Sequence, residues 1–116
     1  HDALPISVFH HSIDDQELHE RVVGNVANLL DDDTIDVESV ALVANSGGLA
    51  LLTADSDQRE TVETLQERGV SFKQCRNTIA GTDVTENDLV DGVELVSSGV
   101  GELTRLQDEG YAYITP

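Results

Sequence analysis

Two patterns of apolar positions alternate along the chain. Short runs rich in β-branched and aromatic residues indicate strands, and stretches with apolar residues three or four positions apart indicate helices. Strands are expected at residues 6–10, 37–45, 70–75, 92–97 and 111–115. Helices are expected at residues 14–33, 56–69, 85–89 and 98–110, and the glycine-opened segment 46–56 has room for one helical turn.

The segments 14–33 and 37–45 show the two patterns most clearly. In the first, Leu18, Val22, Val26, Leu29 and Leu30 follow the spacing of a helix with one buried face. The second is almost continuously apolar, which is typical of a strand covered on both faces. Strands that alternate with helices imply a parallel sheet between helical layers. The sequence therefore predicts an α/β fold, a three-layer αβα sandwich around a mainly parallel five-stranded sheet.

The strand order and the extent of the domain are further expectations. Right-handed crossovers restrict the arrangement of strands, and a flavodoxin-like order, 2-1-3-4-5, is the simplest result. A chain of 116 residues suits one domain, which we expect to comprise residues 6–116. The first five residues, HDALP, fit no element well, so residues 1–5 are expected to be a non-native or disordered end.

The composition adds a strongly acidic character. Six Lys and Arg stand against 23 Asp and Glu, which gives a net charge of −17. This charge repels nucleic acids and anionic lipid, so neither is expected as a partner. Hydrophobic residues make up 39% of the chain and recur in regular periods, which argues against disorder. Many carboxylates with a single lysine resemble the composition of proteins from salt-loving organisms, so we expect a halophilic protein.

The location and cofactors follow from what the sequence lacks. No apolar run approaches the roughly 20 residues of a membrane-spanning helix, and a secretion signal is not recognisable. One cysteine cannot form an internal disulfide. We therefore expect a soluble cytoplasmic protein. The segment NSGGLALL could bring backbone amides to an anion, but it matches neither the GxGxxG motif nor the Walker motif of nucleotide-binding proteins. We therefore expect a tight turn there, and no cofactor.

Residues with reactive side chains gather where the predicted strands end. In open parallel sheets, ligands and reactive groups collect beyond the carboxyl ends of the strands. The third strand ends at Cys75, the only cysteine, and the first ends at His10. These strands are neighbours in the order 2-1-3-4-5. We expect Cys75 to be a nucleophile whose pKa Lys73 and Arg76 lower, and His10 to exchange protons with it.

Other interpretations of the same residues stay open. Free cysteine is among the most buried residue types, so Cys75 could equally be an inert apolar side chain. His10 and His11 are adjacent in a strand and project to opposite faces. At most one of them therefore points at Cys75, and the two cannot easily share an ion. No metal site is expected.

The second half of the chain resembles the DsrE/DsrF-like family. The matching stretch is GVSFKQCRNTIAGTDVTENDLVDGVELVSSGVGELTRLQDEGYAYITP, residues 69–116. In this family a strand ends in Cys followed by an Asn-Thr pair, and a short helix, a "GVELVSSGVGEL"-like segment and a closing "QDEGYAYITP"-like segment come next. The segment VFHHSIDD and residues 40–52 match more loosely, so the resemblance covers residues 6–116.

This resemblance implies a three-layer αβα fold that usually assembles into trimers or hexamers. Some members take part in sulfur relay, in which a cysteine accepts sulfur as a persulfide and passes it to a partner protein. The matching cysteine is Cys75, and Asn77 and Thr78 match the residues after it, with Asn77 shaping the loop. The leading hypothesis is a sulfurtransferase-like persulfide carrier with sulfur donor and acceptor proteins as partners. The alternatives are a non-catalytic oligomeric binding module and a thiol redox sensor.

Overall fold

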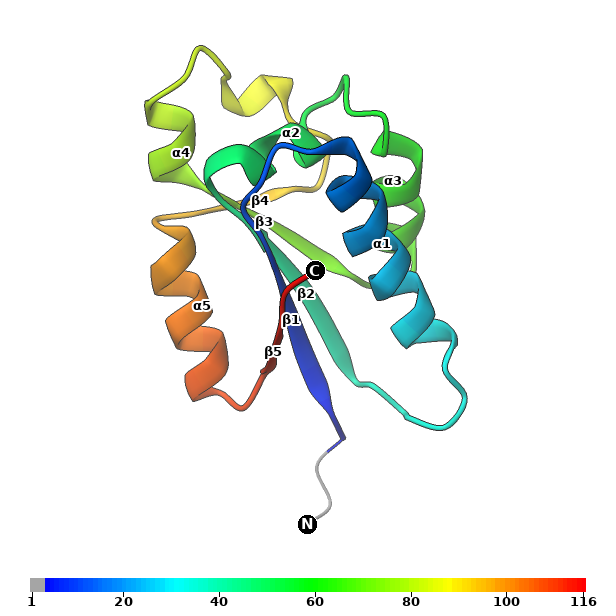
Figure 1. The fold of residues 1–116 in the computed structure, drawn as a ribbon. Helices are drawn as coiled ribbons and strands as arrows, with labels where there is room; N and C mark the ends of the chain where they lie inside the picture. The colour runs from blue at the N-terminus through cyan, green and yellow to red at the C-terminus, as the bar shows by residue number, and fades with distance from the viewer. Residues whose placement is uncertain (1–3) are drawn as a thin grey trace.

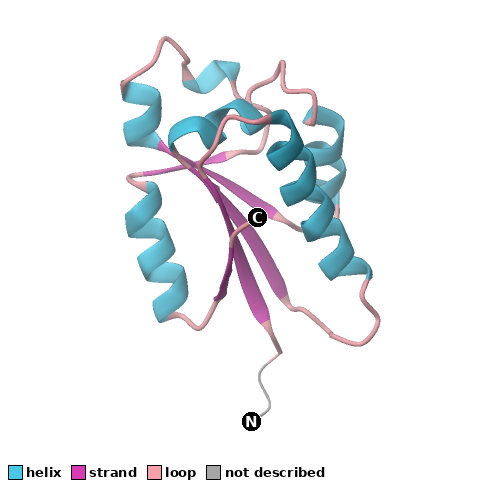
Figure 2. Cartoon of the chain, in the orientation of Figure 1, coloured by secondary structure: helices cyan, strands magenta, loops and turns pink. Residues whose placement is uncertain are grey.

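The computed structural model describes residues 4–116 as one five-stranded sheet with helices on both faces (Figures 1 and 2). Every strand pair is parallel, which confirms the predicted sheet. The elements are β1 (Ile6–His11), α1 (Gln16–Asp31), β2 (Ser39–Ala44), the 3₁₀ turn η1 (Ser46–Gly48), α2 (Leu49–Leu52), α3 (Arg59–Glu67), β3 (Ser71–Cys75), α4 (Arg76–Ala80), the 3₁₀ turn η2 (Glu86–Asp88), β4 (Glu94–Val96), α5 (Gly99–Asp108) and β5 (Ala112–Ile114).

The sheet separates two apolar clusters of unequal size. Figure 1 shows α1 and α3 on one side of the sheet and α5 on the other. Side chains alternate along a strand, so neighbouring residues of one strand enter different clusters. Leu42 of β2 packs in the larger cluster with Val22 of α1 and Leu65 of α3, whereas Val43 packs in the smaller one with Leu103 of α5. The predicted three-layer sandwich is therefore confirmed.

The predicted strand order is wrong. The sheet has the order β4-β3-β2-β1-β5, so β2 lies between β1 and β3. The strands β1, β2 and β3 are added in one direction, and right-handed crossovers then place α1 and α3 on one face. The chain returns across the sheet from β4 to β5, which places α5 on the opposite face. The apolar pattern specifies parallel strands, but it does not specify on which side each strand joins the sheet.

A short helix replaces the loop that the sequence indicates after the third strand. Residues 76–80 form α4, and Cys75 is its N-cap residue, with φ −64° and ψ 122°. Figure 1 shows α4 and α2 beyond the carboxyl ends of the strands, where the sequence places its reactive residues. The N-terminal N–H groups of α4 are consequently close to the side chain of Cys75.

The beginning of the chain is described in part. Residues 1–3 of the segment 1–5, predicted to be a non-native or disordered end, lie outside the described residues. The carbonyl of Pro5 accepts a hydrogen bond from the backbone N–H of Glu38, at 2.8 Å. Within residues 4–116, no helix has both the length and the apolar character that crossing a bilayer requires.

Candidate functional site

The site forms where β2, β3 and β4 end on the face of the sheet that α5 covers. Side chains two residues apart on a strand share a face, and Lys73 of β3 reaches Glu102 of α5. Cys75 therefore also faces α5, and the two side chains share one face of the strand, as their spacing of two residues predicts. The first residue of α5, Gly99, follows β4 and lies against this edge. Two helices, α4 and α5, thus begin beside one sulfur atom.

The surroundings of Cys75 favour its thiolate. Burial, the largest single influence, raises the pKa of the thiol, but hydrogen-bond donors outweigh it and the net pKa is lowered. These donors are the hydroxyl of Thr78 and the backbone N–H groups of Gly99, Thr78 and Asn77. N–H groups at the start of a helix stabilise an anion. The arrangement therefore favours negative charge on the sulfur through hydrogen-bond donors.

The two cations that the sequence assigns to Cys75 have other surroundings. The Nζ atom of Lys73 lies 2.6 Å from Oε2 of Glu102 and 3.6 Å from Oε2 of Glu94. Burial opposes the charge of Lys73, but the two carboxylates outweigh it and raise its pKa. Arg76 is exposed at the start of α4. The positive charge of Lys73 is thus offset by carboxylates, and the groups that lower the pKa of Cys75 are the Thr78 hydroxyl and backbone N–H groups.

His10 is linked to the site through the end of β2. Its Nε2 atom lies 3.0 Å from Oδ1 of Asn45, and its Nδ1 atom lies 2.6 Å from the hydroxyl of Tyr113. The amide oxygen of Asn45 only accepts, so Nε2 of His10 donates to it. The predicted strand order would place His10 beside Cys75. In the structure β2 lies between β1 and β3, so His10 contacts Asn45 at the end of β2 instead.

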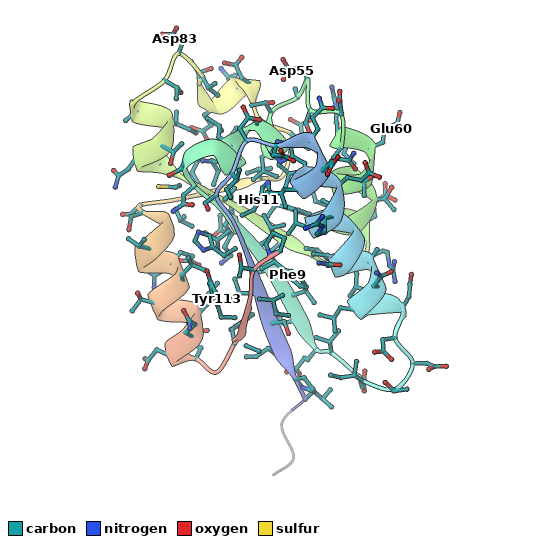
Figure 3. The ribbon with its side chains drawn as sticks, in the orientation of Figure 1. Phe9, His11, Asp55, Glu60, Asp83 and Tyr113 are labelled. Atoms are coloured by element: carbon teal, nitrogen blue, oxygen red, sulfur yellow. The ribbon has the colours of Figure 1, made fainter. Side chains whose placement is uncertain are left out.

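His11 points to the opposite face, as adjacent strand residues must. Its Nε2 atom lies 2.5 Å from Nδ1 of His19 on α1, and Nε2 of His19 lies 3.3 Å from Oδ1 of Asp14. Burial, followed by the charges of His19 and His10, lowers the pKa of His11 to about 4, although Asp14 opposes the shift. His11 is therefore neutral at pH 7. Figure 3 shows it near the end of β1.

The thiol itself is covered. Cys75 exposes 6% of its surface, whereas the sequence-based hypothesis of a carrier requires an accessible sulfur. The five residues of α4, which directly follow Cys75, are not buried themselves. Within the part of the chain that is described, no group of three or more His, Cys, Asp and Glu side chains is arranged to hold a metal ion.

Sequence reasoning found part of this arrangement. It placed Cys75 and His10 at the carboxyl edge and included Asn77, whose backbone N–H faces the sulfur. It missed the contributions of Thr78 and Gly99 as donors. For Gly99 the signal was the predicted helix that follows the fourth strand. For Thr78 there was none, because the sequence does not indicate the helix α4 in which it lies.

Comparison with known proteins places the chain among its relatives. The solved structure described as a protein of unknown function, MTH1491, from Methanobacterium thermoautotrophicum is 39% identical, with a TM-score of 0.89 over 97% of this chain and 99% of that one. The ychN protein from E. coli has the same fold at 17% identity, with a TM-score of 0.70 over 98% of this chain and 100% of that one.

The search of curated proteins finds no match. The model of the DsrE/DsrF-like family matches residues 14–116. This range includes Cys75, the Asn77 and Thr78 that follow it, and all the donors around the sulfur. The chain therefore belongs to the DsrE/DsrF-like family.

Proposed function

We propose that this protein carries sulfur as a persulfide on Cys75, in the manner of a sulfurtransferase-like relay protein. The observation that supports the proposal is the set of donors around the sulfur, which lowers the pKa of the thiol although the thiol is buried. The thiolate is the nucleophilic form of cysteine. Membership of the DsrE/DsrF-like family favours the same chemistry.

The proposed reaction is thiol–disulfide exchange with a persulfide donor. The thiolate of Cys75 attacks the outer sulfur of a donor R–S–SH. A new S–S bond forms to Cys75, the S–S bond of the donor breaks, and its electron pair leaves with R–S⁻. The products are Cys75–S–SH and R–S⁻, with no net oxidation. An acceptor thiolate then attacks the outer sulfur, and Cys75 is released as thiolate.

The donors around Cys75 serve both halves of this exchange. They stabilise the thiolate before it attacks and again when it leaves. Cys75 exposes 6% of its surface, so access of a sulfur donor to the thiol requires a local opening of its surroundings. The proposal also includes proton exchange by His10 and a contribution of Arg76 to the thiol site. It further includes separate sulfur donor and acceptor proteins and assembly of the chain into trimers or hexamers.

Sulfur loading tests the proposal directly. The native protein is incubated with glutathione persulfide, freed of small molecules and weighed by intact mass spectrometry. We expect the wild type to gain the mass of one sulfur atom, and Cys75→Ser to gain none. Subsequent treatment with a thiol should remove the added sulfur. Equal gain by the serine variant would show that Cys75 is not the acceptor.

The exposure of Cys75 favours a second candidate, a non-catalytic binding module. A side chain that is 6% exposed matches the expectation for a thiol that packs as a small apolar group. This candidate requires the sulfur to stay unreactive while the chain is folded. The two candidates therefore differ in the reactivity of the native thiol toward small reagents.

A further inference from the structure

The turn that follows β2 lies against the thiol site and has an unusual backbone. Ala44 pairs with Gln74, so the next residue of the chain, Asn45, comes level with Cys75. Ser46 has a φ of 48°, which makes it the one non-glycine residue among residues 4–116 with a positive φ. Strain of this kind persists where surrounding contacts hold it, and it is concentrated at functional sites.

Ser46 is held by a contact with one of the donors to Cys75. Its backbone N–H donates to Oγ1 of Thr78 at 2.9 Å. A threonine hydroxyl has a single proton and two acceptor positions. Because Ser46 occupies an acceptor position, the Thr78 proton remains available to the sulfur. The left-handed conformation of Ser46 thus orients the hydroxyl that reaches Cys75.

Asn45 lies against the second donor. A β-carbon at Gly99 would lie 3.1 Å from Cβ and 3.3 Å from Nδ2 of Asn45, so the asparagine side chain rests directly on the glycine backbone. The other end of the Asn45 amide accepts from His10. This pair of contacts fixes Asn45 and limits the movement of the first residue of α5, whose N–H faces Cys75.

We infer that Asn45 and Ser46 are positioning residues for the thiol site: Ser46 orients the Thr78 hydroxyl, and Asn45 holds the Gly99 backbone. The inference rests on the proposed function, because it concerns the preparation of the same thiol for attack. One turn at the end of β2 therefore controls donors that come from two different helices, α4 and α5.

The pKa of the Cys75 thiol in the native protein tests the Thr78 step. Thiolate absorbance near 240 nm is followed across pH, with Cys75→Ser as the blank, so the sulfur need not be accessible to a reagent. We expect Thr78→Val and Thr78→Ala to raise the pKa, and Thr78→Ser to restore the wild-type value. An identical pKa in all of these proteins would overturn the inference.

Paired variants test the turn itself. Ser46→Gly keeps the N–H and suits a positive φ, so the thiol pKa should stay unchanged. Ser46→Val disfavours that conformation and should raise the pKa, as should Asn45→Ala through release of Gly99. Equal pKa values for Ser46→Gly and Ser46→Val would contradict the role of Ser46, and no shift in Asn45→Ala would contradict that of Asn45.

The results for the positioning roles can be told apart from the results for the sulfur-carrier proposal. The thiol pKa is measured without a sulfur donor, and sulfur loading is measured on the wild type. Raised pKa values in Thr78→Val, Ser46→Val and Asn45→Ala support the positioning roles even if wild-type protein gains no sulfur. Normal sulfur loading with unshifted pKa values would overturn the positioning roles and leave the carrier intact.

Discussion

His11 shows how a single buried residue links the fold to pH. It is 1% exposed and its pKa is lowered from 6.5 to about 4. Between these values the unfolded chain binds a proton that the folded protein does not. The free energy of unfolding therefore falls as the pH decreases from 6.5 to 4, and below that range this residue causes no further loss.

Replacement of His11 by a group that does not titrate should remove this dependence. We expect the free energy of unfolding of the wild type to fall by about 3 kcal/mol more than that of His11→Gln between pH 6.5 and pH 4. Urea denaturation of both proteins at several pH values provides the measurement. The carboxylates remote from His11 contribute equally to both, so parallel curves would contradict the assignment of a neutral buried histidine.

The sequence predicts the face of the sheet toward which a strand side chain points better than it predicts which residue that side chain contacts. The alternation of side chains along a strand was sufficient to place His10 and His11 on opposite faces. The same rule correctly placed Lys73 on the face of Cys75. It could not show that Glu102, 29 residues further along, would form an ion pair with Lys73, because that contact depends on where α5 crosses the sheet.

At the scale of elements, glycines mark where two backbones meet. Gly48 is the last residue of η1, directly before α2, and a β-carbon there would overlap the carbonyl oxygen of His11 and lie 2.7 Å from its carbonyl carbon. The close approach brings the segment after β2 onto the end of β1. Gly24 of α1 differs, because a β-carbon there would meet no atom within 4 Å.

Alanine at these two positions should therefore have opposite effects. Gly48→Ala should lower the free energy of unfolding by about 2–3 kcal/mol or more, since neither backbone can move aside freely. Gly24→Ala should raise it by about 0.5–1 kcal/mol, because alanine favours a helix interior. Thermal or urea denaturation of both variants measures the effects. A stable Gly48→Ala protein would contradict the described packing of the segment against β1.

The elements themselves were largely predictable, and α4 shows the exception. The long helices have apolar periods, and the short helix expected at residues 85–89 is present as the 3₁₀ turn η2, which a capping box of Thr85 and Asp88 begins. The sequence of α4, RNTIA, is five residues long and buries no side chain, so it has no apolar period to detect. The element that supplies two of the N–H donors to Cys75 was therefore the one that periodicity could not reveal.

At the scale of the whole molecule, the order of the strands determines which residues can meet. In the predicted order, His10 and Cys75 would end adjacent strands. In the order β4-β3-β2-β1-β5, the end of β2 lies between them, and Asn45 takes the position next to His10. Strand order depends on long-range packing of helices, which local patterns do not encode.

The charge of the molecule is distributed over its periphery. Figure 3 shows Asp55, Glu60 and Asp83 at separate outer positions, and all three are exposed. The net charge of −17 favours interaction with a partner that presents positive charge. A halophilic origin and assembly into trimers or hexamers stay predictions.

The reactivity of the native thiol is the most direct test of the central claim, that the folded protein presents Cys75 as a usable thiolate. The rate of alkylation by iodoacetamide is measured across pH for the native protein and for the same chain in denaturant. We expect the native thiol to react without denaturant, with an apparent pKa below that of the unfolded chain. A thiol that reacts only after unfolding would contradict the claim and favour the binding module.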